Sequence, residues 1–197
     1  MFKKLFLTGI ALLLIAATAH ADTYQIDATH SSVTFAVTHM GLSKVKGEFK
    51  QFAGTVDYDP GDVSKSKVDA TIQVSSIDTH AEKRDGHLKS GDFFAADSFP
   101  TMTFKSTKVT DKGNGQLEIL GDLTIRGTTK PVTLAASLIG SMDDPMGGKR
   151  VGFSAHTKIN RMDYGVKWSR VLDSGGVVVG NDVDIQIEIE AVAKKDK

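Results

Sequence analysis

Strict alternation of apolar and polar residues is the feature that most limits how this chain can fold. The clearest run lies near the C-terminus, where Val183, Ile185, Ile187 and Ile189 alternate with acidic and amide side chains. Successive side chains of a strand point to opposite faces, so this run predicts a strand with one buried and one solvated face. Similar runs recur from residue 24 onward, separated by turns rich in Gly, Asn, Asp and Pro. We count about eight strands joined mostly by short turns, which predicts an all-β antiparallel meander.

Eight antiparallel strands can close into a barrel or pack as a sandwich, and the alternation alone favours neither. Closure removes the exposed edge strands through which open sheets associate. A barrel of about eight strands has an interior that side chains fill or that holds one small ligand. Small residues at the expected inward positions favour a cavity, and they are Ala70, Gly121, Ala136 and Ala155.

Residues 79–90 interrupt the strand pattern and predict a short helix inserted between strands. Thr79 and Glu82 have the spacing of a capping box, in which each side chain binds a free amide of the first turn. Lys89 suits the negative end of a helix, and Gly91 follows as a stop. We expect the helix to sit on the barrel as a plug, seated by three phenylalanines, Phe93, Phe94 and Phe99.

The first 21 residues have the pattern of a cleavable secretory signal. Lys3 and Lys4 precede an apolar run at residues 5–17, and Ala19-His20-Ala21 matches an A-x-A cleavage motif. We therefore expect a signal peptide over residues 1–21, cleaved after Ala21, and a single exported domain over residues 22–197. Because the chain has no cysteine, its stability should come from an apolar core rather than from disulfides.

Charge and motif content argue against several other classes of protein. Without Lys3 and Lys4, 22 of the 24 basic residues remain against 24 acidic ones, so nucleic acid is not an expected partner. His80 and His87 would share one helix face, but no H-x-H, H-E-x-x-H or cysteine motif supports a metal site. Ser31 next to His30, with Asp27 nearby, leaves a hydrolase as a minor alternative. However, adjacent strand residues face apart and there is no G-x-S-x-G motif, so we do not predict an enzyme.

Ordered motifs run through nearly the whole of residues 22–197. They are Asp27-x-x-His30-Ser31-x-Val33-x-Phe35-x-Val37-x-His39-Met40-Gly41, Val45-x-Gly47-x-Phe49-x-x-Phe52-x-Gly54, Arg84-Asp85-x-His87-Leu88-x-x-x-x-Phe93-Phe94, Gly121-x-Leu123-Thr124-Ile125-x-Gly127, Gly152-Phe153-x-Ala155 and Arg161-x-Asp163-Tyr164-Gly165. Together these motifs resemble the YceI-like family. The resemblance implies a lipocalin-like antiparallel barrel, typically exported in bacteria, whose elongated apolar cavity binds polyisoprenoid chains such as quinone tails. One departure is Met146, which stands where the family's turn has an aromatic after the proline.

On this basis we expect a periplasmic protein that binds, and carries or buffers, an isoprenoid lipid of quinone or polyprenyl type without a cofactor. Expected wall residues are Phe35, Val37, Phe49, Ile72, Val74, Phe104, Leu123, Ile125, Phe153, Ile185 and Ile187, with Phe93 and Phe94 at the plug. Arg84, His87, Arg161 and Trp168 are expected at the mouth or head-group end.

Each of these residues also has a purely structural interpretation. Residues at such wall positions are more often plain core than ligand contacts, Arg84 can pair with Asp85, Arg161 can pair with Asp163, and Trp168 can fix its loop in place. A carrier would make transient contact with membranes, and the sequence leaves the oligomeric state open, a homodimer included. The main alternative is an exported stress-response or interaction scaffold without a lipid. A carrier requires a continuous apolar tunnel, whereas a scaffold requires a filled interior.

Overall fold

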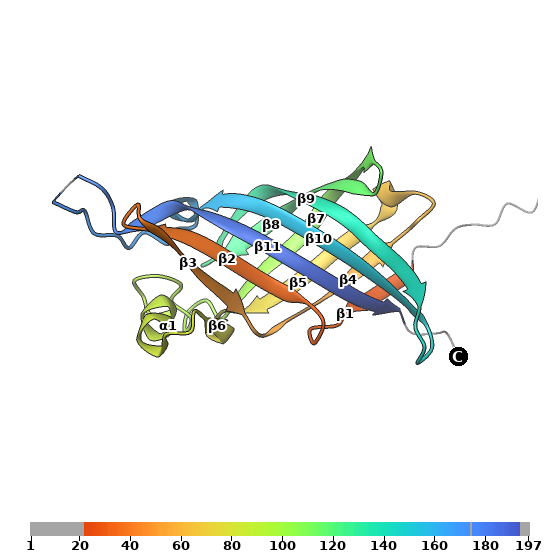
Figure 1. The fold of residues 1–197 in the computed structure, drawn as a ribbon, viewed down its shortest axis with the longest axis horizontal. Helices are drawn as coiled ribbons and strands as arrows, with labels where there is room; N and C mark the ends of the chain where they lie inside the picture. Colours follow the sequence, from red (N-terminus) through yellow and green to blue (C-terminus); the bar gives the residue numbers. More distant parts are fainter. Residues whose placement is uncertain (1–21, 174, 194–197) are drawn as a thin grey trace, which may run out of the picture.

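A closed antiparallel barrel makes up most of the protein (Figure 1). The computed structural model describes residues 22–173 and 175–193, so the expected signal peptide lies outside the described residues. The strands are β1 (Asp22–Ile26), β2 (Ser32–His39), β3 (Ser43–Phe49), β4 (Phe52–Tyr58), β5 (Lys67–Gln73), β6 (Ile77–Asp78), β7 (Thr101–Gly113), β8 (Gln116–Ile125), β9 (Thr128–Asp143), β10 (Lys149–Asn160) and β11 (Val179–Ala193). Between them lie one helix, α1 (Glu82–Lys89), and three 3-10 turns, η1 (Val63–Lys65), η2 (Val74–Ser76) and η3 (Arg161–Tyr164). Within the described residues, no helix has the length and apolar character needed to cross a membrane.

The eleven strands combine into eight long ones, because three pairs of short strands continue each other. Strands β1 and β2 both pair with β11, on either side of a bend at residues 27–31. On the other side, β1 pairs with β4 and β2 pairs with β3. Beyond these, β4 pairs with β5 and β3 pairs with β6. With β7 to β11 these make a ring of eight antiparallel strands, in which every strand has two neighbours. The predicted eight-stranded lipocalin-like barrel is therefore confirmed.

The inward face of the barrel carries the apolar rows expected from the alternation. In β8, for example, Leu117, Ile119, Leu123 and Ile125 are all buried. Gly121 does not leave the space that we expected, because the place of its missing Cβ lies 2.4 Å from a ring atom of Phe104. A glycine in a strand lets a neighbouring group approach the backbone closely, and here the ring of Phe104 occupies the gap.

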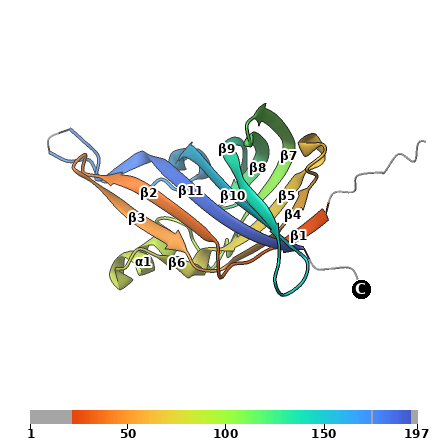
Figure 2. The same ribbon diagram turned by 45° about the vertical axis from the view of Figure 1, so that its right-hand side comes forward.

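Helix α1 forms at the expected place but begins two residues later than the capping box predicted, since its N-cap is Ala81 rather than Thr79. It lies outside one end of the barrel, next to β6 (Figures 1 and 2). Its N-cap is Ala81, which makes no side-chain hydrogen bond to the helix. The hydroxyl of Thr79 instead donates to Asp85 Oδ1 at 2.5 Å and accepts from Arg84 Nε at 2.7 Å. The capping-box prediction is wrong because this hydroxyl is engaged further along the helix.

The turn that follows α1, rather than the helix itself, plugs the barrel. No residue of α1 is buried, whereas Phe93 is buried and Phe94 packs edge-on against Phe49 with ring centroids 6.1 Å apart. Arg126 donates to the carbonyl oxygen of Phe93 and so ties this turn to the β8–β9 connection. Phe99 packs next to Gly127 in that connection. The phenylalanines therefore seat the segment as expected, while α1 remains largely solvated.

An apolar cavity as the candidate functional site

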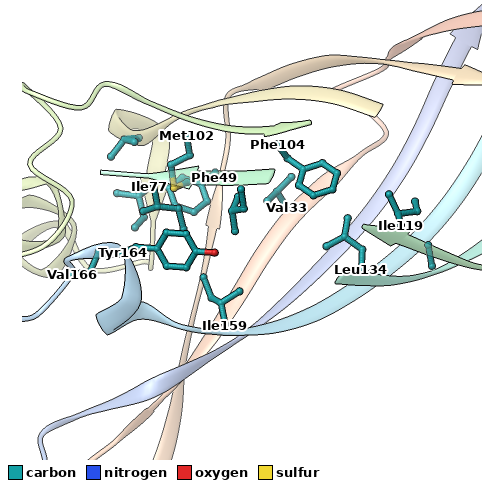
Figure 3. Close-up of a cluster of buried hydrophobic side chains, with 14 of the residues drawn as sticks. Val33, Phe49, Ile77, Met102, Phe104, Ile119, Leu134, Ile159, Tyr164 and Val166 are labelled. Carbon is teal, nitrogen blue, oxygen red and sulfur yellow. The ribbon is translucent and has the colours of Figure 1, made fainter. Parts of the chain in front are cut away.

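The inward rows of the barrel enclose an apolar cavity of about 240 Å³. Figure 3 labels several side chains that line this interior, among them Val33 of β2, Phe104 of β7, Ile119 of β8, Leu134 of β9 and Ile159 of β10. Packed protein interiors leave few voids larger than a water molecule, and an apolar void of about 150 Å³ already stays dry and binds small apolar molecules. The interior is therefore not filled, and its chemistry suits a hydrocarbon ligand.

The cavity extends along the barrel from one end to the other. At the end nearest β1 its lining includes Ile26, Tyr58 and Ser66. At the end nearest α1 it includes Leu88 and Val166. A long, narrow space of this kind matches an extended chain better than a compact ring system.

Thirteen of the seventeen candidate residues line this cavity. They are Phe35, Val37, Phe49, Ile72, Phe93, Phe94, Phe104, Leu123, Ile125, Phe153, Arg161, Ile185 and Ile187. The other four, Val74, Arg84, His87 and Trp168, are absent from the lining. Val74 was placed on the wall by alternation, but β5 ends at Gln73 and Val74 starts the turn η2, where it is buried in the surrounding core.

Arg161 holds the backbone together at one end of the cavity. It is 6% exposed and donates to four carbonyl oxygens, those of Val166, Trp168, Val179 and Gly180, at 2.6 to 3.1 Å. Burial lowers the pKa of its guanidinium. The alternative that Arg161 pairs with Asp163 is wrong, because its donors are taken up by the backbone. Its position is therefore structural, although the side chain also borders the cavity.

Trp168 and His87 form an aromatic cluster with Phe93 just outside the cavity lining. The ring centroids lie 5.2 Å apart for Trp168 and Phe93, and 5.0 Å apart for Trp168 and His87. His87 Nε2 also lies 2.8 Å from Asp92 Oδ2. These contacts join the loop before β11 to the segment after α1. Trp168 therefore fixes its loop in place, which is the structural role that we considered for it.

Arg84 also has a structural role at this end of the barrel. Its Nη2 donates to the carbonyl oxygen of Thr79 at 2.6 Å, in addition to the bond from Nε to the hydroxyl. Asp85 binds the same threonine, so Arg84 and Asp85 act on a shared residue and do not form the direct pair that we considered. Arg84 therefore shapes the turn into α1.

Tyr164 is a functional candidate that the site prediction omitted. It is 2% exposed and borders the cavity, and Figure 3 shows its hydroxyl directed toward the barrel interior above Ile159. Burial raises the pKa of the phenol to about 12. Among the described residues, no hydrogen-bond partner is found for this hydroxyl, so it offers a polar contact inside an otherwise apolar space. Its place in the Arg161-x-Asp163-Tyr164-Gly165 motif was the signal that could have revealed it.

Comparison with known proteins identifies the family. Residues 24–191 match the YceI-like domain. This chain belongs to the YceI-like family. Protein YceI of Shigella flexneri is 43% identical over 191 residues, which cover 96% of each chain. A Campylobacter jejuni YceI protein of known crystal structure is 34% identical in sequence. Its superposition has a TM-score of 0.69 and covers 80% of this chain and 90% of that one.

A more distant structure shares only the fold. It is a polyisoprenoid binding domain from Saccharophagus degradans, 14% identical, with a TM-score of 0.61 and coverage of 86% of this chain and 98% of that one. The family resemblance noted from the motifs is thus confirmed for this YceI-like chain, and so is the barrel.

An ionic network lies on this YceI-like barrel at the bend between β1 and β2. Arg150 is its centre and donates to Asp27 at 3.2 Å, to Asp144 at 2.8 Å and to Glu190. Asp27 also lies 2.8 Å from His30 Nδ1, and this hydrogen bond, helped by Arg150, lowers the pKa of Asp27 to about 2. Asp144 is buried against Arg150, whereas its neighbour Asp143 in the same turn is exposed.

The network bears on two alternatives considered from the sequence, metal binding and hydrolysis. Asp27, His30 and Glu190 lie close enough together to hold a metal ion, but Arg150 already supplies a fixed positive charge to both carboxylates. Ser31 donates to and accepts from the backbone of Glu190, at 3.2 and 3.0 Å. Its hydroxyl is therefore engaged with the backbone, and the Asp27–His30 pair has no serine nucleophile bonded to it.

Proposed function

We propose that this protein binds an isoprenoid lipid of quinone or polyprenyl type in its barrel cavity, and carries or buffers it in the periplasm without covalent chemistry. The observation that supports this most directly is the apolar cavity that runs the length of the barrel. The shared fold with a polyisoprenoid binding domain and the family membership agree with it. The signal-like residues 1–21 are the basis for export and for a periplasmic location.

The energetics favour a carrier over a permanent store. Burying a methylene group contributes roughly 0.8 kcal/mol relative to water, so a tail of about 40 carbons gives a gross term of about 30 kcal/mol. That sum exceeds the ceiling of about 20 kcal/mol for non-covalent affinity, so simple addition overcounts. The relevant competitor is the bilayer, which solvates the same tail about as well as an apolar lumen does. The net transfer is then near zero, and small contacts decide the direction.

Two neighbouring alanines of β9 provide a matched test. Ala136 borders the cavity, whereas Ala135 is exposed on the outside of the same strand. Ala136→Phe should fill part of the lumen and lower the amount of lipid that co-purifies with the protein by at least about fivefold, while Ala135→Phe should leave it unchanged. The measurement is solvent extraction and mass spectrometry of protein expressed with its own signal sequence.

The interpretation of this test depends on folding, which the circular dichroism spectrum and the unfolding transition of both variants will establish. A wild-type protein that consistently contains no lipid, and takes up none from added isoprenoid quinone, would contradict the proposed function. Equal lipid content in the two folded variants would place the ligand outside the lumen.

A further inference from the structure

One end of the barrel carries exposed aliphatic side chains on two turns that lie next to each other. The β2–β3 turn presents Met40 and Leu42, and the loop before β11 presents Val171 and Val177. Leu42 is 87% exposed and Val171 is 72% exposed. We call these four residues the apolar tip.

The two turns are joined by the backbone. The amide of Met40 donates to the carbonyl oxygen of Val178 at 2.9 Å, and the pairing of β2 with β11 begins one residue later at Val179. Figures 1 and 2 both show the β2–β3 turn beside this loop, projecting from the same end of the barrel. The apolar tip is therefore one surface built on strands that also form the cavity wall.

Charge distinguishes these two turns from the turn at the opposite end. Segments 39–46 and 166–178 contain four cations and a single acid, namely Lys44, Lys46, Lys167 and Arg170 against Asp173. The opposite end also has an exposed apolar residue, Met146 at 92%, but its turn at residues 139–150 carries two acids and two cations. Those two cations, Lys149 and Arg150, are already paired with carboxylates, whereas among the four cations of the tip segments the described residues pair only Lys44, with Asp184.

We propose that the apolar tip docks this protein on an anionic lipid surface and that the ligand enters or leaves the cavity at this end. Exposed aliphatic residues with cations in the same two segments suit the boundary between lipid head groups and acyl chains. The cavity lining reaches the base of the same turns at Val37, Val166 and Val179. A tail leaving the bilayer would pass the turn with Phe93 and Phe94 that plugs this end, and the path beyond it is apolar. This proposal rests on the proposed function, since it names the surface from which the lipid is taken.

Vesicle sedimentation tests the docking with purified full-length mature protein. The probe is vesicles of phosphatidylethanolamine with phosphatidylglycerol, compared with phosphatidylcholine alone and at low and high salt. Wild-type protein should bind the anionic vesicles preferentially, and high salt should weaken binding because it screens the cations. The double variant Leu42→Asp, Val171→Asp should bind at least about tenfold more weakly, because two aliphatic side chains leave the lipid phase. Met146→Asp, at the opposite end, is the matched control and should bind like wild type.

Other outcomes overturn the proposal. Equal binding by wild type and the tip variant, loss of binding in Met146→Asp, or no vesicle binding by wild type would each do so. A tip variant that changes a dimer into a monomer in size-exclusion chromatography, with vesicle binding unchanged, would show that a second copy covers the tip.

Retention of isoprenoid quinone loaded from detergent separates this proposal from the proposed function. Protein that retains the quinone but ignores vesicles contradicts only the docking. Protein that binds vesicles through the tip but retains no quinone contradicts lipid carriage.

Discussion

Tyr164 is the residue that best separates ligand recognition from packing. A ligand group that accepts a hydrogen bond from its phenol gains free energy relative to a pure hydrocarbon. Its position near α1 places this polar contact at the end of the cavity where Arg161 and Val166 also lie. A quinone-type head group at that end would find a donor there, and the tail would fill the rest of the barrel.

The Tyr164→Phe variant should therefore change ligand preference more than stability. We expect the ratio of retained isoprenoid quinone to retained isoprenoid hydrocarbon to fall about fivefold, which corresponds to one hydrogen bond of about 1 kcal/mol. The midpoint of urea unfolding should stay close to that of wild type, because no bond within the described protein is lost. The measurement is mass spectrometry of protein loaded from an equimolar mixture.

Tyr58 supplies the control for this prediction. Its phenol also borders the cavity and burial also raises its pKa, but it lies toward the opposite end. Tyr58→Phe should leave the quinone to hydrocarbon ratio unchanged. A fall in the ratio for Tyr58→Phe, and none for Tyr164→Phe, would show that the head group lies at the opposite end of the cavity.

Among the elements, η3 and the loop that follows it depend on a single side chain. The carbonyl groups that Arg161 binds belong to that loop and to the start of β11. Without the guanidinium these carbonyls would be left buried or partly buried without a donor, each at a cost of about 1 kcal/mol or more. Arg161→Met should therefore lower the free energy of unfolding by about 3 kcal/mol in urea titrations.

A lysine at the same position gives the comparison for Arg161→Met. Arg161→Lys keeps the charge, but an ammonium group lacks the fork of donors and reaches fewer carbonyls, so its loss should be intermediate. A change of less than about 0.5 kcal/mol for Arg161→Met would show that water satisfies the carbonyls instead.

The elements also show where sequence patterns succeed and fail. Alternation predicted β8 to β11 because each is long and has one face on the lumen. It misplaced Val74 because the chain leaves the strand for the turn η2 at that residue, and a 3-10 turn does not preserve the two-residue period. Gly121 was mistaken for empty space because a sequence does not reveal which neighbouring ring, here that of Phe104, leans over a glycine.

The residues at the cavity end were harder to predict than the wall. The wall follows from the inward rows, but Arg161 binds main-chain groups of the following loop and of the start of β11, and such bonds leave no simple pattern in the sequence. Asp144 is buried for a similar reason, because its partner, Arg150, lies across the β9–β10 connection and takes part in a network with Asp27 and Glu190. Tertiary hydrogen bonds therefore decided the roles that residue type and spacing left open.

For the whole molecule, the seam between the first and last strands is where the barrel depends on charge. Within the described residues, strand β1 pairs with β11 only at Gln25 and Ile26 before the bend at residues 27–31. The network centred on Arg150 crosses this bend and joins it to β10, to β11 and to the β9–β10 turn. Loss of its charges should weaken closure of the barrel before it affects the rest of the sheet.

The stability of the barrel should consequently fall in acid through Asp27. Its pKa is about 2 in the folded protein, below the ordinary value of 3.8, so its contribution is present above about pH 4 and is lost as the pH falls toward 2. The bond to Asp27 raises the pKa of His30, so that contribution is present below pH 6.5 and is lost as the pH rises through the raised value. Asp27→Asn removes both contributions and should flatten both limbs of the stability profile measured by urea unfolding at a series of pH values.

Asp143 is the matched control, because it is an exposed carboxylate in the turn next to Asp144. Asp143→Asn should keep the wild-type shape of the profile, with an acid limb between about pH 4 and 2. If Asp27→Asn kept the same acid limb, the seam would not depend on this carboxylate. In that case the amides of β1 and β11 should also stay protected from hydrogen exchange in acid. If the network does hold the seam, its loss in acid should expose these amides to exchange before those of β7 and β8.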